Sequence, residues 1–354
     1  MLSFLKSFFT GNSVLGVDIG TSSIKIAEIS KSSEKPKLKN YGILEAQSHL
    51  ERSNSALQTN SLKLADKETA KLISALVEKS RFKTKNVVAS IPSFSSFVTL
   101  VEMPKMSNEE VNKTMSYQIR QYIPLPESEV AIDWIKVGES ESEGIIKQQI
   151  LLVSIPNEEI RRYQNIFKLA GLKLKSLEIE SMALSRALVF GDLTPTILVD
   201  IGAYSTNIAV VENGFLKSNI FTDFAGSSLT QAIANGLGIE MKRAEELKKQ
   251  KGLKATGGEY QLSTLPQPFL DVIIGEVVRI RENFEAKKSK KIERVLLAGG
   301  GANLIGIEEY FEKQTGLPSA LGNALLRVDY PKETELFSKE LGAELAVAIG
   351  LAIK

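Results

Sequence analysis

The chain has 354 residues, of which 43% are hydrophobic, and its 44 Lys and Arg residues against 42 Asp and Glu give a formal net charge of +2. This length suits two domains, or one large domain with insertions, and buries a substantial core. Cysteine is absent and His49 is the single histidine, which excludes disulfides, thiol nucleophiles and cysteine–zinc sites and argues against a Ser-His-Asp hydrolase. Because the charge is balanced, we expect no nucleic-acid partner.

Hydropathy predicts no membrane span. No apolar run approaches the roughly 18 residues that a span needs, and the longest run near the C-terminus covers residues 345–353. Residues 1–9 are too short for a secretory signal and lack its small-residue cleavage site, so we expect them to pack or fray rather than to anchor the chain. The sequence therefore predicts a protein of the reducing cytoplasm.

One segment of eleven residues occurs twice. Residues 17–27 and 199–209 share Val, Asp, Ile, Gly, Ser, Ile and Ala at the same seven positions. Each copy has an apolar strand, a glycine turn and a strand of alternating character, which is typical of a β-hairpin. The repeat predicts two domains of related fold that face each other.

The stretch from about residue 86 to residue 172 has a different pattern. A helix is predicted to begin at the capping box of Ser107 and Glu110, and the acidic residues 139–144 are predicted to form a hairpin loop. Strands are predicted over residues 87–91, 97–103, 130–137 and 149–155. We therefore expect a small inserted subdomain of strands plus a helix.

The predicted organisation has a first domain over residues 1–190, which contains this insert, and a second domain over residues 191–337, with its own subdomain at about residues 236–292. A final helix over residues 338–354 is expected to pack back on the first domain. Further helices are predicted over residues 227–237, 242–251 and 270–288.

Three glycine-bearing turns follow predicted strands, at Gly20, at Gly202 and at residues 299–301. Glycine lets successive backbone N–H groups converge on an anion, so these turns indicate phosphate binding. A P-loop is excluded because Gly-Lys occurs nowhere in the chain. A dinucleotide-binding fold is weakly supported, because Leu304 stands at the third glycine position of its fingerprint and hairpins are not βαβ units.

An aspartate stands two residues before each turn glycine of the repeat, at Asp18 and Asp200. A carboxylate at a strand end beside a phosphate cradle holds Mg²⁺ through its waters, because magnesium gives up its hydration shell reluctantly. For either hairpin alone, an Asx-type turn is the better explanation of the aspartate. The matched pair, with a glycine-rich loop downstream, favours nucleotide binding with Asp18 and Asp200 near the metal.

The order of these motifs resembles the actin and DnaK-type chaperone ATPase superfamily over nearly the whole chain. The resemblance implies a duplicated α/β actin-like fold that binds ATP and Mg²⁺ between two domains. The first hairpin would bind the phosphates, with Lys25 on a phosphate oxygen; the second would bracket them from the opposing domain, and the glycine-rich loop would lie against the adenosine. The implied nucleotide-binding residues are Gly20, Thr21, Ser22, Ser23, Lys25, Gly202, Ala203, Ser205, Thr206, Gly299, Gly300, Gly301 and Asn303.

Two further segments resemble the same superfamily. Residues 180–184 are similar to the helix start whose glutamate positions the attacking water in bacterial actins, with Ser181 in place of the usual proline. The resemblance makes Glu180 a candidate catalytic residue beside Asp18 and Asp200, and the alternative is a carboxylate placed at a helix N-terminus by the helix dipole.

The second segment, residues 244–248, resembles the family's Ala-Glu-x-x-Lys, whose Glu and Lys contact the adenine and ribose. Here those residues are Glu245 and Lys248, and the alternative is an ordinary i,i+3 ion pair. Because Ala203 and Tyr204 replace the flexible glycines over the γ-phosphate, we expect ATP hydrolysis to be slow or absent.

The insert resembles that of the division protein family FtsA and of its relatives in the PilM family of type IV pilus assembly. PilM is the closer resemblance because of four features. They are the second hairpin (residues 200–206), the order in which residues 88–93 precede residues 103–106, the connecting helix at residues 180–187, and a C-terminus without the amphipathic helix of FtsA. An FtsA-like division protein and, on the same fold, a small-molecule kinase stay open as alternatives.

The PilM resemblance implies a partner. It is the cytoplasmic N-terminal tail of a PilN-like inner-membrane protein, bound in a groove next to the insert, which would hold the chain at the membrane indirectly. Residues 94–106 are the predicted groove, and the alternative is that their apolar members are core. Self-association is left open.

Overall fold

The computed structural model describes residues 13–31, 35–45, 66–118, 121–123, 125–142, 144–254, 260–288 and 290–354. The expectations for residues 1–9 and for His49 lie outside this part of the chain. Within it, no helix is long and apolar enough to cross a membrane.

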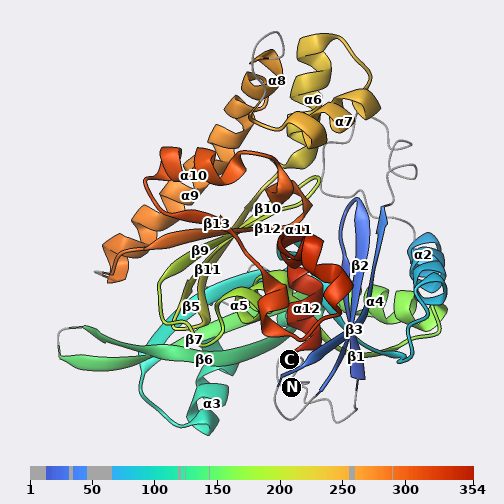
Figure 1. Cartoon of the computed structure of the whole chain (residues 1–354). Helices are drawn as coiled ribbons and strands as arrows, with labels where there is room; N and C mark the ends of the chain where they lie inside the picture. The colour runs from blue at the N-terminus through green and yellow to red at the C-terminus, as the bar shows by residue number, and fades with distance from the viewer. Residues whose placement is uncertain are drawn as a thin grey trace.

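Two five-stranded sheets have the same topology (Figure 1). In each sheet the first three strands are antiparallel and the remaining two join in parallel. The order of the first sheet is β3 (Lys37–Glu45), β2 (Ser23–Ser30), β1 (Ser13–Ile19), β4 (Asn86–Ile91) and β8 (Lys173–Ile179). The order of the second sheet is β11 (Phe215–Thr222), β10 (Thr206–Glu212), β9 (Thr196–Ile201), β12 (Arg294–Ala298) and β13 (Ser319–Leu321). The two hairpins predicted from the repeat are therefore confirmed, and each occupies the same place in its sheet.

A separate three-stranded antiparallel sheet has the order β5 (Phe97–Pro104), β7 (Ile145–Pro156), β6 (Val130–Ser142). Helix α3 (Asn108–Gln118) packs on it, with Trp134 donating from Nε1 to Asn112 Oδ1 at 2.9 Å. The predicted capping box is present: the Ser107 N–H donates to Glu110 Oε2 at 2.8 Å, and the Glu110 N–H donates to Ser107 Oγ at 3.3 Å. We call this sheet with α3 the insert.

Two local predictions for the insert are wrong. The strand at residues 86–91 is β4, which pairs in parallel with β1 and β8 of the first sheet and not with the insert. Residues 139–142 are strand rather than loop, because β6 keeps pairing with β7 as far as Ser142 opposite Ile145. Glu139 is tolerated there because Lys136 Nζ lies 2.8 Å from its carboxylate.

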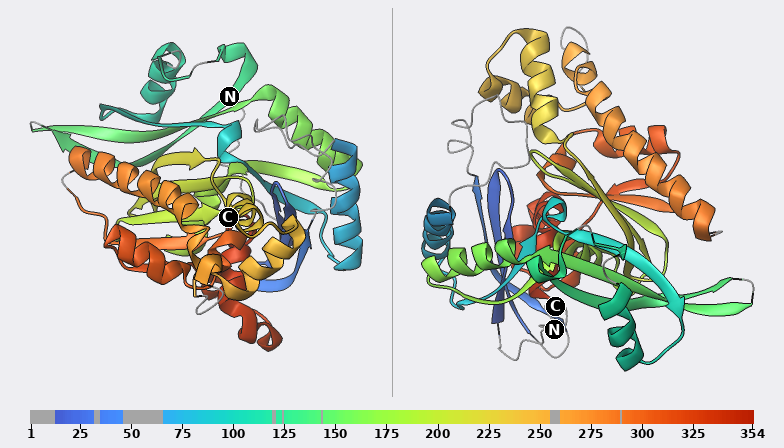
Figure 2. Two further views of the ribbon diagram at one scale, coloured as in Figure 1. Left: turned by 90° about the horizontal axis from the view of Figure 1, so that it is seen from above. Right: turned by 180° about the vertical axis from the view of Figure 1, so that it is seen from behind.

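Helices cover the sheets in layers. Helices α2 and α4 cover one face of the first sheet, while α5 and α12 lie on its other face, between the two sheets (Figure 1). Figure 2 shows the insert at the end of the molecule opposite α6 and α7. The helices are α2 (Asp66–Lys79), α4 (Asn157–Leu169), α5 (Glu180–Val189), α6 (Gly226–Leu237), α7 (Met241–Lys251), α8 (Tyr260–Thr264), α9 (Gln267–Lys288), α10 (Ile307–Thr315), α11 (Ser338–Glu344) and α12 (Ala346–Ala352).

The C-terminal segment forms two helices and not the single helix predicted over residues 338–354. They meet at Leu345, whose φ of −91° and ψ of 6° interrupt the helix. Helix α12 is buried throughout and contacts β1, β2, β4 and α5. Glycines allow this approach: a Cβ on Gly16 would lie 1.9 Å from Ala348 O, and one on Gly350 would lie 2.0 Å from Ala183 O. The domain boundaries stay a prediction.

Candidate functional site

The two hairpin turns of the repeat have the same geometry. The Gly20 N–H donates to Ser23 O at 3.0 Å, and the Gly202 N–H donates to Ser205 O at 3.0 Å. A Cβ on Gly20 would lie 3.0 Å from Ser23 O, and one on Gly202 would lie 2.8 Å from Ser205 O. Glycine is therefore required at both turns by the close return of the chain. The predicted residues Thr21 and Ser22, and Ala203 beside Tyr204, stand at the two tips.

The first carboxylate, Asp18, is almost fully buried at the end of β1. It lies opposite Lys25 in the β1–β2 pair, with Lys25 Nζ 4.0 Å from Asp18 Oδ2. Ser90 of β4 donates to the other carboxylate oxygen, Oδ1, at 2.9 Å. Burying a carboxylate requires such partners, so Asp18 and Lys25 are held together at the strand end.

The second carboxylate, Asp200, occupies the same place at the end of β9, and Asn207 stands opposite it, where Lys25 stands in the first hairpin. Asp200 is half-buried. Burial raises the pKa of Asp200 to about 6, Lys25 opposes this rise and the charge of Asp18 adds to it. The charges of Lys25 and Asp18 in the first hairpin therefore influence Asp200 in the second.

A third carboxylate joins them. Glu180 is the first residue of α5 and is half-buried, and its Oε2 accepts a hydrogen bond from the Ser93 N–H at 3.4 Å. Burial and the charges of Asp18 and Asp200 raise the pKa of Glu180 well above its usual range. The structure thus brings together all three carboxylates predicted from the sequence.

The charge of Asp18 raises the pKa of both Asp200 and Glu180, and a cation bound at this site would oppose that rise. Among the described residues, no group of three or more His, Asp or Glu side chains is arranged to hold a metal directly. This donor set fits Mg²⁺ held through its waters and through phosphate oxygens, with Asp18 and Asp200 as the nearest protein groups.

The third glycine motif packs against the second carboxylate. Strand β12 pairs Ala298 with Asp200, and Gly299 follows with a φ of +82°. The Gly299 N–H donates to Ala343 O at 3.0 Å, and Asn303 Nδ2 donates to Glu340 O at 3.4 Å. Both groups therefore hold the loop onto α11, and their predicted contact with adenosine stays a prediction, as does that of Gly300 and Gly301.

The predicted pair on α7 is an ion pair with further partners. Lys248 Nζ lies 2.7 Å from Glu245 Oε2 and donates to Gly226 O at 2.9 Å and to Thr230 Oγ1 at 2.9 Å. Burial lowers the pKa of Lys248, against the opposing charge of Glu245. The Gly226 N–H donates in turn to Gly202 O at 3.0 Å. Through α6, the pair on α7 is attached to the second hairpin turn.

Helix α7 also contacts the first sheet. Lys249 Nζ lies 3.5 Å from Glu45 Oε1 at the end of β3, and both side chains are exposed. This ion pair joins α7 to the edge strand β3 of the first sheet, at the end of the molecule opposite the insert.

Sequence reasoning missed a polar cluster beside Glu180. The fully buried Ser181 hydroxyl donates to Asn219 Oδ1 at 2.6 Å, accepts from Asn207 Nδ2 at 2.9 Å and lies 3.3 Å from Ser93 Oγ. Proline has no hydroxyl, so the replacement of the family's proline by Ser181 was the available signal. These contacts join α5, the turn that leads into the insert, and both strands of the hairpin β10–β11.

Comparison with known protein families identifies the family of the chain. A family model described as "Type IV pilus assembly protein PilM" matches residues 16–354. The chain belongs to the PilM family. This confirms the resemblance found in the sequence motifs.

Solved structures confirm the actin-like fold. A structure named "PilM-PilN type IV pilus biogenesis complex" matches with a TM-score of 0.78 at 22% identity, over 96% of this chain and 97% of that one. MreB5 of Spiroplasma citri bound to ADP matches with a TM-score of 0.54 at 13% identity, over 96% of this chain and 94% of that one.

Curated relatives match over shorter stretches. The cell division protein FtsA of Neisseria meningitidis serogroup B is 24% identical over 223 residues, which are 55% of this chain and 53% of that protein. FtsA of Bacillus subtilis is 34% identical over 85 residues, 23% of this chain and 19% of that protein. The chain thus spans about half, or less, of the curated relatives that it matches.

Proposed function

We propose that this member of the PilM family is an ATP-binding scaffold of the type IV pilus assembly machine. ATP with Mg²⁺ binds between the hairpins β1–β2 and β9–β10, and the chain binds the cytoplasmic N-terminal tail of a PilN-like inner-membrane protein. The observation that carries the nucleotide part is the meeting of Asp18, Asp200 and Glu180 with Lys25, held by two matching turns from opposite sheets.

The chemistry of this site suits binding better than rapid hydrolysis. Bound Mg²⁺ supplies positive charge to the phosphates, and Lys25 supplies a further cation beside Asp18. Burial and the charges of Asp18 and Asp200 raise the pKa of Glu180, and a bound cation would lower it again. The second turn carries Ala203 and Tyr204 where the resemblance places flexible glycines over the γ-phosphate. We therefore propose weak ATPase activity at most.

The partner is proposed from the family and from the name of the solved PilM-PilN complex. Of the predicted groove residues 94–106, Val101 and Met103 are buried in the core of the insert, so for them the core alternative holds. Phe97 is 41% exposed and remains available to a peptide. A bound tail would place the chain at the inner membrane.

The test is a titration of the purified chain with a synthetic peptide of the N-terminal tail of a PilN-like protein encoded nearby, with and without ATP and Mg²⁺. Asp18→Ala is the site variant, and Asp329→Ala, an exposed aspartate beside Lys35, is the matched control. We expect saturable peptide binding whose affinity changes with ATP in the wild type and in Asp329→Ala, and loses that ATP dependence in Asp18→Ala. Absence of peptide binding in every state would contradict the proposal of a PilN-like partner.

An FtsA-like role in division is the second candidate, because both curated relatives are FtsA proteins. A fluorescent fusion distinguishes the two. Foci that coincide with pilus machines support the first candidate, and recruitment to the division ring supports the second.

A further inference from the structure

Strand β11 is the edge of the second sheet that faces the insert. It contacts β5 and β6 of the insert, the turn at Ser93–Ser95 that leads into the insert, and α5. Three of its side chains, Lys217, Asn219 and Phe221, make these contacts. Each reaches a different part of the first half of the chain.

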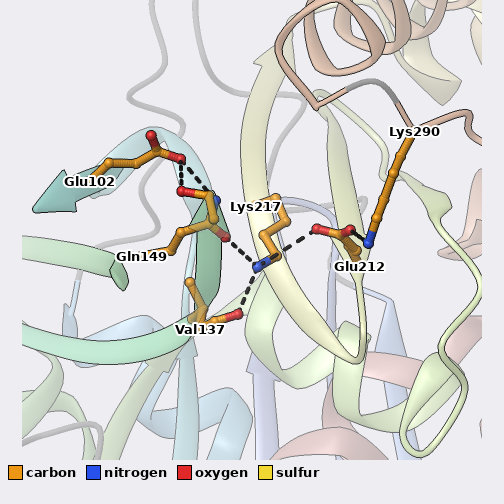
Figure 3. A network of polar contacts seen from close by, with 7 residues as sticks. Glu102, Val137, Gln149, Glu212, Lys217 and Lys290 are labelled. Carbon is orange, nitrogen blue, oxygen red and sulfur yellow. Dashed lines mark hydrogen bonds and ion pairs between the residues drawn. The ribbon is translucent and has the colours of Figure 1, made fainter. Parts of the chain in front are cut away.

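Lys217 is the extra residue of a β-bulge, because Val210 pairs with Ser218 while Val211 pairs with Leu216. Its side chain is only 2% exposed. A bulge leaves its extra residue outside the ladder and turns the side chain in a new direction. Here it turns toward the insert, as Figure 3 shows.

On the side of the insert, the residue that accepts the hydrogen bond from Lys217 also lies at a β-bulge. In the β6–β7 pair Lys136 pairs with Ile150 and Gly138 with Gln149, which leaves Val137 as the extra residue. Lys217 Nζ donates to Val137 O at 2.6 Å and to Gln149 Oε1 at 2.8 Å (Figure 3). A Cβ on Gly138 would lie 3.0 Å from this ammonium, so the glycine makes room for it.

The ammonium is held from both sides. Glu212 of β10 lies 3.8 Å from Lys217 Nζ and also pairs with Lys290, while Gln149 Nε2 donates to Glu102 Oε1 at 2.9 Å. A buried charge that is separated from its partners costs several kcal/mol. The insert and the second sheet therefore resist separation at this point.

The same strand reaches the three-carboxylate site. Asn219 accepts from the hydroxyl of Ser181, the residue after Glu180, and the ring of Phe221 lies 6.3 Å from that of Phe94. Phe94 neighbours Ser93, whose N–H donates to Glu180. One strand thus contacts both the insert and the groups that position Glu180.

We infer that β11 couples the insert to the second sheet, with Lys217 as its main positioning residue, so that the insert follows the second sheet when the two sheets change their separation. This inference rests on the proposed function for the trigger, which is nucleotide bound between the sheets. Its consequence is that the insert shifts relative to the first sheet, which alters the surface between them where the partner peptide is proposed to bind.

Distances between spin labels test this coupling. The chain contains no cysteine, so engineered cysteine pairs are labelled selectively. The exposed labelling positions are Glu109 on α3 of the insert, Asn283 on α9 of the second half and Lys71 on α2 of the first half. The double variant Glu109→Cys with Asn283→Cys, called the second-sheet pair, reports the insert against the second sheet. The double variant Glu109→Cys with Lys71→Cys, called the first-sheet pair, reports the insert against the first sheet.

In the otherwise wild-type chain, saturation with ATP and Mg²⁺ is expected to shift the distance of the first-sheet pair and to leave that of the second-sheet pair unchanged. The opposite pattern, or no shift in either pair at saturation, would overturn the inference. Nucleotide binding is measured separately by titration, so its failure is recognised as failure of the proposed function.

Lys217→Met tests the contact between β11 and the insert in the absence of nucleotide. Its expected effect is a broader distance distribution of the second-sheet pair, because the insert is released from β11, while Glu212 keeps Lys290 as a partner. Lys290→Met removes a cation from the same Glu212 without touching the insert and is expected to leave the distribution unchanged. Gln149→Met, which removes one of the two acceptors of Lys217 in the insert together with a hydrogen bond to Glu102 inside the insert, serves if Lys217→Met does not fold. An unchanged distribution in Lys217→Met, or in Gln149→Met where that variant alone folds, would overturn the inference whether or not ATP binds.

Discussion

Gly299 lies against the carboxylate of Asp200: a Cβ atom added to this glycine would come within 2.3 Å of Asp200 Oδ1 and within 2.5 Å of Ile201 O. The glycine-rich loop after β12 and the second carboxylate are therefore parts of one packed unit. The absence of a side chain at residue 299 determines how closely the loop approaches the end of β9.

Gly299→Ala is expected to reduce the free energy of unfolding by more than about 3 kcal/mol, because it combines a positive φ with a backbone clash. The control is Gly300→Ala, whose Cβ would meet nothing closer than Glu344 Oε1 at 3.9 Å and should change stability by less than about 0.5 kcal/mol. Urea denaturation measures both. Equal effects of the two substitutions would contradict the close packing of residue 299 on Asp200.

The pH dependence of stability follows from Asp200. Its pKa rises on folding from 3.8 to about 6, so between these pH values the folded chain binds more protons than the unfolded chain. The free energy of unfolding therefore decreases as pH rises through this window and levels off above it. Glu180, with its raised pKa, contributes in the same direction.

Asp200→Asn should flatten this slope and stabilise the nucleotide-free chain at pH 8, by an amount on the order of 1 kcal/mol after solvent screening. Asp192→Asn is the control of opposite sign, because hydrogen bonds from Thr194 and the charge of Arg294 lower the pKa of Asp192 to about 2. It should lower stability at neutral pH, and that loss should fade in acid. Denaturation midpoints from pH 2 to pH 8 check both, because the contribution of Asp192 is lost only as the pH falls below its ordinary pKa of 3.8 toward about 2. A slope in Asp200→Asn as steep as that of the wild type, or steeper, would refute the assignment.

Ser181→Ala should cost about 2 to 3 kcal/mol, because it leaves the buried Asn207 and the half-buried Asn219 side chains each without one partner. Ser185→Ala, one turn later in α5, removes a single hydrogen bond to Gly214 O and should cost about 1 kcal/mol. Thermal unfolding compares the two variants. A loss of stability in Ser181→Ala no larger than that in Ser185→Ala would show that the polar cluster around Ser181 adds no stability.

Arg186→Met tests how α12 is held. Glu178 is fully buried, and its carboxylate is paired with Arg186 and, at 3.5 Å, with Lys354; Arg186 also donates to Gly350 O at 2.6 Å. Removing Arg186 should cost about 3 to 5 kcal/mol, since the buried carboxylate loses its main partner. Arg243→Met breaks an exposed pair with Glu246 and should cost less than about 0.5 kcal/mol. Similar losses in both variants would be inconsistent with a buried, structural pair.

The elements predicted correctly have local signals. Each hairpin is built from neighbouring residues, with a glycine wherever the chain returns within 3.0 Å, so Gly20 and Gly202 were visible in the repeat. The capping box of Ser107 and Glu110 is local in the same sense. Grouping Asp18, Asp200 and Glu180 needed more than local signals, and there the resemblance to actin-like ATPases supplied the arrangement.

The features that were missed depend on long-range pairing. Strand β4 was assigned to the insert because it is apolar and lies close to β5 in sequence, while its true partner β1 lies about seventy residues upstream. The helix break at Leu345 lies within one continuous apolar run. The contact between Lys217 and Val137 spans 80 residues and joins two bulges, which no periodic pattern reveals.

Hydrogen exchange of the full chain, with and without ATP and Mg²⁺, tests the central claim most directly. One nucleotide bound between the sheets should slow exchange together in three segments: residues 20–25, residues 202–206 and residues 299–303. It should do so in the wild type and not in Asp18→Ala. Protection confined to one sheet, or none at saturating ATP, would contradict a nucleotide site shared by the two hairpins.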